Sequence, residues 1–192
     1  AALLALAQPD PDACVLEVGA ATGSLTEELL ERCRRVVAVE ADARLAEVLR
    51  HRLGERGNLT VIAGDALAGK HALNPAVLDA LDERAQLVAN LPYSIATPLV
   101  ALCLSAAWHA DRADGRQADA HSQRRLDGGE TPATHTRETP VPRPAPPACG
   151  RPHFDRLTFT VQQEVADRLL ASPGCGAYGP ISVLVALLAR AR

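Results

Sequence analysis

Short apolar runs that fit buried β-strands alternate with segments of helical periodicity over most of this 192-residue chain. Short apolar runs bounded by turn residues are typical of buried strands, whereas apolar residues spaced three and four apart are typical of helices. Such alternation favours an α/β domain with a doubly wound, mostly parallel sheet. The expected strands cover 14–18, 36–39, 59–63, 86–89 and 156–162, and the expected helices include 24–33, 75–82, 97–107, 164–171 and 181–189. A further helix is expected to be capped by Asp42 and to end at Gly54 or Gly57.

One stretch interrupts this alternation. Residues 109–152 are rich in Arg, Asp, His, Thr, Gly and Pro and have almost no apolar periodicity, which is typical of a disordered segment. An RNA-binding arm is the alternative, but the near-neutral charge of the stretch disfavours it. Because the length suits one domain, we expect a single core formed by 1–108 and 153–192, with 109–152 as a disordered insertion.

The charge of the chain limits how it could bind nucleic acid. The formal net charge is −3, and residues 1–110 carry 9 basic and 14 acidic side chains. A surface that grips RNA through its phosphates is usually basic. The composition therefore argues against tight binding of RNA by this chain alone.

Cysteine usage and hydropathy indicate a cytoplasmic protein. The five cysteines are odd in number and form no CxxC pair, which is typical of reduced thiols inside cells. The apolar residues 1–7 lack the basic flank of a signal peptide, and we interpret them as part of a truncated helix. No apolar run approaches the roughly 20 residues that span a bilayer, so no membrane contact is expected.

A glycine-containing turn, EVGAATG at residues 17–23, joins the first expected strand to the first expected helix. Glycines allow a sharp turn and close approach of a ligand to the backbone, and the start of the following helix favours negative charge. This pattern alone is weak, because a tight strand-to-helix turn without any ligand would look the same.

Two acidic residues follow the next two expected strands. Glu40 ends the second strand about 20 residues beyond the glycine turn, where doubly wound folds place an acid that binds ribose hydroxyls. Asp65 ends the third strand, and there a carboxylate could accept from the exocyclic amine of a base. Either could instead be a helix-cap or turn carboxylate, but together with the glycine turn they predict a nucleoside-bearing cofactor. NAD fits less well because GxGxxG is absent.

The motif Asn90-Leu91-Pro92-Tyr93 directly follows the fourth expected strand. The N6 amine of adenine is a poor nucleophile, because its lone pair is delocalised into the ring. The Asn90 side-chain oxygen and the Leu91 carbonyl could accept hydrogen bonds from both N–H groups, and Pro92 would fix the backbone between them. Tyr93 would offer a flat face to a base removed from its stack. The alternative is a proline turn that covers a buried tyrosine.

The sequence resembles the ribosomal RNA adenine dimethyltransferases of the small subunit, which are related to macrolide-resistance methyltransferases of the large subunit. The resemblance rests on VLEVGAATGSLTEEL, VVAVEAD, GDAL, NLPYSIATPL, FTVQQEVADRL and AYGPISV, and it covers most of 12–108 and 154–186. It implies a Rossmann-like class I methyltransferase fold, S-adenosylmethionine as cofactor, no metal, and adenines of ribosomal RNA as substrate. The implied partner is ribosomal RNA or a small-subunit precursor, and a monomer is expected.

The resemblance also implies roles for individual residues. Gly19 and Gly23 would line the methionine end of the cofactor, Glu40 would hold the ribose, and Asp65 would meet the adenine of the cofactor. The expected cofactor-binding residues are Glu17, Gly19, Ala21, Gly23, Glu40, Ala41, Asp65, Ala66 and Asn90. The expected catalytic residues, which would grip the target adenine, are Asn90, Leu91, Pro92, Tyr93 and Phe159, with Phe159 stacking on the second face unless it is a core residue. Gln162 and Glu164 match the family motif but have no physical role that we can assign.

Several departures from the family pattern bear on activity. Ala21 stands where the family usually has glycine, and its methyl group is expected to crowd the cofactor. The family's N-terminal Gln-Asn-Phe segment and C-terminal helical domain are absent from the sequence, which suggests a fragment, and 109–152 is longer than the usual connection. Three functions are therefore kept open: small-subunit methylation, large-subunit methylation, and a non-catalytic ribosome-assembly or transcription factor with the same fold.

Overall fold

The computed structural model describes residues 2–106 and 152–191. The expected insertion, 109–152, lies outside the described residues except for Pro152, which is buried. The strands are β1 (Cys14–Val18), β2 (Arg35–Glu40), β3 (Leu59–Ala63), β4 (Arg84–Asn90) and β5 (His153–Thr160). The helices are α1 (Ala2–Ala7), α2 (Ser24–Leu30), α3 (Ala43–Leu53), α4 (Pro75–Ala80), an unlabelled helix over 93–106, α6 (Gln163–Leu169) and α7 (Pro180–Leu188). None of the helices in the described part of the chain is long and apolar enough to cross a membrane.

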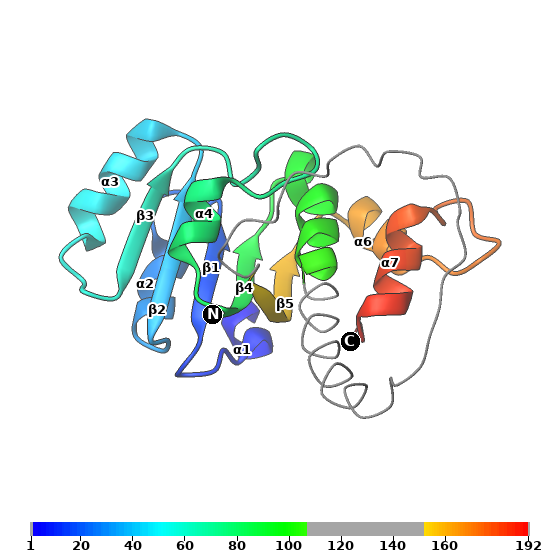
Figure 1. Cartoon of the computed structure of the whole chain (residues 1–192), viewed down its shortest axis with the longest axis horizontal. Helices are drawn as coiled ribbons and strands as arrows, with labels where there is room; N and C mark the ends of the chain where they lie inside the picture. The colour runs from blue at the N-terminus through cyan, green and yellow to red at the C-terminus, as the bar shows by residue number, and fades with distance from the viewer. Residues whose placement is uncertain (1, 107–151, 192) are drawn as a thin grey trace, which may run out of the picture.

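The five strands form one parallel sheet in the order β3-β2-β1-β4-β5, as Figure 1 shows. The chain first builds outward from β1 through β2 to β3, and it then returns to the other side of β1 to add β4 and β5. This reversal makes the sheet doubly wound, so the predicted fold class is confirmed. Parallel neighbours also place the carboxyl ends of all five strands at one edge.

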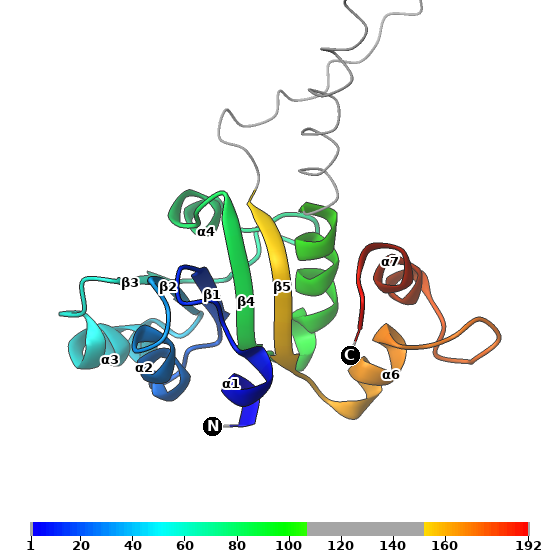
Figure 2. The same cartoon turned by 90° about the horizontal axis from the view of Figure 1, so that it is seen from below.

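Helices cover both faces of the sheet, which gives three layers (Figure 2). Alternate strand residues point to opposite faces, so Leu16 and Val37 pack on one side whereas Val15 and Val36 pack on the other. Helices α4, 93–106, α6 and α7 cover the Leu16 face, and α1, α2 and α3 cover the Val15 face. Burial on both faces explains why the central strands are continuous apolar runs.

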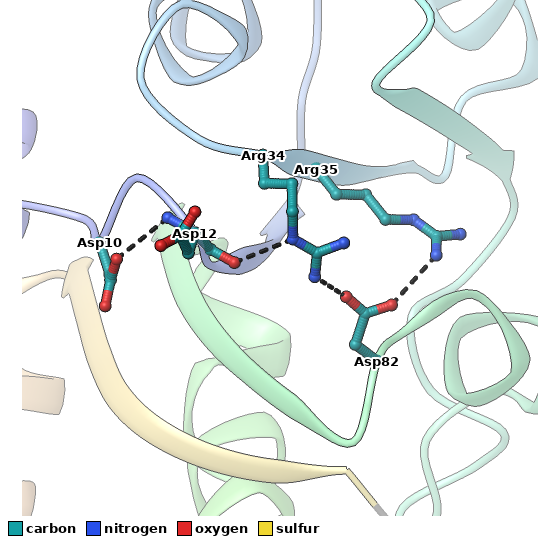
Figure 3. Close-up of polar contacts among 5 residues, drawn as sticks. All are labelled: Asp10, Asp12, Arg34, Arg35 and Asp82. Atoms are coloured by element: carbon teal, nitrogen blue, oxygen red, sulfur yellow. Dashed lines mark hydrogen bonds and ion pairs between the residues drawn. The ribbon is translucent and has the colours of Figure 1, made fainter.

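Ion pairs hold the amino-terminal edge of the sheet together (Figure 3). Asp82, just before β4, accepts hydrogen bonds from Arg34 and Arg35, which precede or begin β2. Arg34 Nε also donates to the backbone carbonyl of Asp12, before β1, at 3.0 Å. A hollow of about 800 Å³ lies at this edge beside Asp10 and Asp82. Side chains therefore join the strands at the edge where they begin. The predicted site lies at the other edge, where the strands end.

Candidate functional site

The predicted site lies at the carboxyl edge of the sheet, around β1 and its two neighbours. After β1 the chain turns to α2 on one face, and after β4 it turns to helix 93–106 on the other face. Ligands of doubly wound proteins bind in the crevice that such a reversal opens at the carboxyl ends of the strands. Strand order alone thus brings the glycine turn and the Asn90 motif next to each other.

The turn after β1 uses left-handed backbone at three positions. Gly19 has φ +79°, Ala21 has φ +49° and Gly23 has φ +87°. The Gly19 nitrogen donates to the Val39 carbonyl at 2.9 Å, so the turn is attached to the end of β2. Ala21 therefore carries a side chain in a backbone conformation that favours glycine.

Glu40, at the end of β2, binds this turn directly. Its Oε2 accepts from the Ala21 nitrogen at 2.7 Å and its Oε1 accepts from the Asp42 nitrogen at 2.9 Å. The Glu40 backbone carbonyl also accepts from the Gly64 nitrogen at 2.8 Å, which joins the end of β2 to the loop after β3. Glu40 thus organises the loops of three strand ends, a role that sequence analysis did not assign to it. Asp42 caps α3 as expected, with Oδ1 accepting from the Arg44 nitrogen at 2.8 Å.

The two glycines of the turn differ in their surroundings. A methyl group at Gly19 would lie 3.7 Å from both the Asn90 carbonyl oxygen and Pro92 Cδ, which is ordinary contact. A methyl group at Gly23 would overlap the Leu49 side chain of α3. Gly19 is therefore the residue of the turn that faces the Asn90 motif, whereas the space beside Gly23 is filled by side chains of α3.

Glu17 is a carboxylate within the core, 2% exposed, on the face that carries α2. The pKa of Glu17 is raised to about 7, mainly by burial and to a smaller extent by the negative charge of Glu40, and the Thr26 hydroxyl offsets part of the rise. Within the described residues, neither Glu17 Oε2 nor Thr26 Oγ1 has a partner at good hydrogen-bond geometry. A buried oxygen without a hydrogen-bond donor destabilises the fold, so Glu17 could take up a proton or accept a hydrogen bond from a ligand.

The expected site residues next to the ends of β2 and β3 differ in their exposure. Asp65 is exposed, and its Oδ1 accepts from the Leu67 nitrogen at 2.9 Å to close a local turn. That bond uses one of its two carboxylate oxygens. Ala41 is exposed beside Glu40, but the Ala66 side chain is 2% exposed and packs in the core. Any ligand contact of Ala66 would therefore have to come from its backbone.

The Asn90 motif forms the connection from β4 to helix 93–106. Leu91 is buried and its nitrogen donates to the Thr160 carbonyl at 3.0 Å, whereas its own carbonyl receives no hydrogen bond from any described residue. The Pro92 carbonyl accepts from the Ile95 and Ala96 nitrogens and so begins the helix. Tyr93 is 53% exposed, so the alternative of a proline turn over a buried tyrosine is wrong.

Strand β5 contributes two residues beside this motif. Phe159 is partly buried and packs against the hydrophobic core. Thr160 ends β5 directly opposite Asn90, and its hydroxyl donates to Asn90 Oδ1 at 2.6 Å. Thr160 was not expected from the sequence, because the strand was predicted to end at residue 162. The matching signal would have been a polar residue at the carboxyl end of the strand next to β4.

Gln162 and Glu164 lie at the start of α6, away from these contacts. Gln162 is the N-cap residue, and its backbone carbonyl accepts from the Val165 nitrogen at 3.0 Å. Its side chain makes no capping hydrogen bond. Both residues therefore help to define where the helix starts, but the described contacts give their side chains no part in the site.

The sheet order, the turn after β1 and the residues at the strand ends define a Rossmann-like α/β protein of the class I methyltransferase type. The chain belongs to the ribosomal RNA adenine dimethylase family, whose model matches residues 2–192.

Individual relatives agree with this assignment. The chain is 31% identical to Ribosomal RNA small subunit methyltransferase A of Clostridium perfringens, over 91% of this chain and 44% of that protein. It is 33% identical to the protein of the same name from Phenylobacterium zucineum, over 97% of this chain and 48% of the relative. A solved dimethyladenosine transferase from Plasmodium falciparum superposes with a TM-score of 0.58 at 25% identity, over 96% of this chain and 48% of that chain. The chain thus spans about half the length of these relatives.

Proposed function

We propose that this chain is the catalytic core of an enzyme that transfers methyl groups from S-adenosylmethionine to the N6 amine of adenine in ribosomal RNA. The substrate we propose is a pair of adjacent adenines in small-subunit RNA, each dimethylated. One observation supports this most: Asn90, Leu91, Pro92 and Tyr93 lie intact at the end of β4, with Gly19 of the turn against them. A protein that kept the fold only as a scaffold would have no need of this arrangement.

The residues at the ends of β1, β2 and β3 suit the cofactor. Gly19 leaves the backbone accessible, and the buried Glu17 Oε2 lacks a donor that the cofactor's ammonium group could provide. Each Glu40 oxygen accepts one backbone hydrogen bond and keeps a lone pair for a ribose hydroxyl. Asp65 is exposed with one oxygen outside its local turn. When bound, S-adenosylmethionine supplies a sulfonium methyl group that a nucleophile can displace in line.

The residues at the ends of β4 and β5 suit the adenine. Asn90 Oδ1 and the Leu91 carbonyl accept hydrogen bonds from the two N6 hydrogens. These bonds hold the amine and turn its lone pair toward the methyl group. The Leu91 carbonyl is not used by any described donor, so no internal hydrogen bond has to break. The exposed Tyr93 ring stacks on one face of the base, and the partly buried Phe159 stacks on the other.

The partners follow from the same reasoning. The acidic balance of residues 1–110 means that this part of the chain does not hold RNA by charge alone. We therefore propose that recognition depends on the folded ribosomal RNA or small-subunit precursor, with the methyltransferase acting as a monomer in the cytoplasm. The names of the two bacterial relatives favour the small subunit over the large one.

Two measurements on this chain test the proposal. Calorimetric titration should detect S-adenosylmethionine binding at micromolar affinity. Transfer of labelled methyl groups should occur to small-subunit RNA in unmethylated particles and not to large-subunit RNA. Asn90→Ala should abolish transfer while cofactor binding persists, and Asn58→Ala, at the opposite edge of the sheet, should retain it. Failure to bind the cofactor would favour a scaffold, and transfer to large-subunit RNA would favour the alternative substrate.

A further inference from the structure

A hydrogen bond between two adjacent strand ends joins the Asn90 amide to β5. Thr160 and Asn90 are the last residues of β5 and β4, and they are partners in the parallel register. The Thr160 hydroxyl donates to Asn90 Oδ1 at 2.6 Å, while the Leu91 nitrogen donates to the Thr160 carbonyl at 3.0 Å. One residue of β5 therefore contacts the side chain of Asn90 and the backbone of the residue that follows it.

We infer that Thr160 is a positioning residue for methyl transfer, which holds the Asn90 amide with Oδ1 in place to accept from the target amine. This inference rests on the proposed function. An amide side chain can turn by half a revolution and present its NH₂ group instead of its oxygen. An amide presented that way would put N–H donors against the N6 hydrogens, and the acceptor that the chemistry needs would be lost.

The exposure of both side chains explains why a partner is needed. Asn90 and Thr160 are both exposed, so packing alone does not select one amide orientation. In the structure the Thr160 hydroxyl donates to Oδ1, and this contact holds the amide oxygen on the side of β5. An amide oxygen has two lone pairs, so Oδ1 can keep the Thr160 bond and still accept from N6. Positioning of this kind raises the rate of the chemical step more than it strengthens cofactor binding.

Substitutions of Thr160 separate this role from a structural one. Thr160→Val keeps the shape and removes the donor, Thr160→Ser keeps the donor, and Thr158→Val removes a hydroxyl two residues earlier on the same strand. We expect Thr160→Val to lower the single-turnover methylation rate about fivefold to tenfold at saturating cofactor and RNA, as for loss of one neutral hydrogen bond. The cofactor Kd should change less than twofold, Thr160→Ser should restore most of the rate, and Thr158→Val should behave as wild type.

The side-chain amide signals of Asn90, measured by nitrogen-15 NMR, provide a readout that does not need activity. Thr160→Val should shift and broaden these signals, whereas Thr158→Val should leave them in place. A Thr160→Val rate equal to that of Thr158→Val overturns the inference while the proposed function stands. An inactive wild-type chain overturns the proposed function, and unchanged Asn90 signals in Thr160→Val would then show separately that Thr160 does not orient this amide.

Discussion

The Glu40 carboxylate accepts a 2.7 Å hydrogen bond from the Ala21 nitrogen, so the end of β2 fixes the turn that follows β1. The same carboxylate accepts from the Asp42 nitrogen at 2.9 Å, immediately before α3. Because Glu40 is only 8% exposed, the carboxylate end of these bonds is largely shielded from water. Changes at either end of this contact should therefore alter stability and cofactor binding in ways that can be separated.

Ala21→Gly should stabilise the protein. Ala21 has φ +49°, where a side chain is strained by roughly 1–2 kcal/mol and glycine is not. Glycine gains flexibility in the unfolded chain, which offsets part of this, so we expect a net gain of about 0.5–1 kcal/mol in the free energy of unfolding. The Glu40 hydrogen bond uses the backbone and should persist. Urea unfolding of both variants measures the difference.

Ala20→Gly is the matched control. Ala20 is buried, and its φ is not among the positive values. Removing its methyl group loses buried apolar contact and adds flexibility to the unfolded chain, so this variant should be less stable than wild type by about 1 kcal/mol. If both glycine variants changed stability in the same direction, strain at Ala21 would not be the reason.

Glu40→Ala should weaken both the fold and the cofactor site. It removes two hydrogen bonds to a carboxylate, which should lower the free energy of unfolding by about 2 kcal/mol. Affinity for S-adenosylmethionine should fall at least tenfold in calorimetry, because the turn and the proposed ribose acceptor are lost together. Asp42→Ala removes only the cap of α3 and should cost about 1 kcal/mol with affinity retained. Equal loss of affinity in both variants would mean that α3, not Glu40, forms the site.

The sheet could be predicted from the sequence because its strands are continuous apolar runs between polar residues and glycines. The expected ranges for β1 and β3 agree with Cys14–Val18 and Leu59–Ala63. The helix expected over 97–107 begins four residues earlier, at Tyr93, and Pro98 lies inside it. β5 covers His153–Thr160 instead of the expected 156–162. Its start was hard to recognise in the sequence, because only Phe154 is buried among its first three residues.

The contacts between strand ends could not be predicted in the same way. A strand buried on both faces has no alternating pattern, so its sequence does not reveal its register against a neighbour. The bonds from Ala21 to Glu40 and from Thr160 to Asn90 depend on that register. The glycine pattern likewise does not distinguish Gly23, which lies against side chains of α3, from Gly19, which faces the Asn90 motif.

Gly23→Ala and Gly19→Ala should therefore lower the stability of the protein for different reasons. A methyl group at Gly23 overlaps Leu49 and also strains a φ of +87°, so this variant should lose about 3 kcal/mol of unfolding free energy. At Gly19 the nearest atoms lie at 3.7 Å and only the left-handed backbone is strained, which should cost about 1 kcal/mol. Thermal unfolding compares the two.

Cofactor affinity should rank these two variants in the opposite order, with the larger loss in Gly19→Ala. Gly19→Ala adds a methyl group to the turn that is proposed to bind the cofactor, so affinity should fall more than tenfold in a protein that remains folded. Gly23→Ala, measured well below its melting temperature, should lose less affinity. A Gly23→Ala protein as stable as wild type would contradict the packing role of that glycine.

Glu17→Gln should change stability in a pH-dependent manner. Burial, with the nearby Glu40 charge, raises the pKa of Glu17 from 4.5 in its ordinary state to about 7 in the folded protein. Between these values the folded state keeps a proton that the unfolded state releases, so the stability contributed by Glu17 is complete below pH 4.5 and is lost as the pH rises to about 7. The total loss should be about 3 kcal/mol, since each pKa unit corresponds to roughly 1.4 kcal/mol. Glutamine does not titrate and escapes this loss.

Urea unfolding at pH 4.5 and pH 8 isolates this effect from the other carboxylates. Glu17→Gln and wild type should have similar stability at pH 4.5, because protonated glutamate and glutamine are both neutral there. At pH 8 the variant should be more stable than wild type by up to about 3 kcal/mol. Glu47→Gln, which removes an exposed carboxylate on α3, controls for the loss of one negative charge. An advantage of Glu17→Gln that was equal at both pH values would arise from packing, and it would contradict the titration of a buried Glu17.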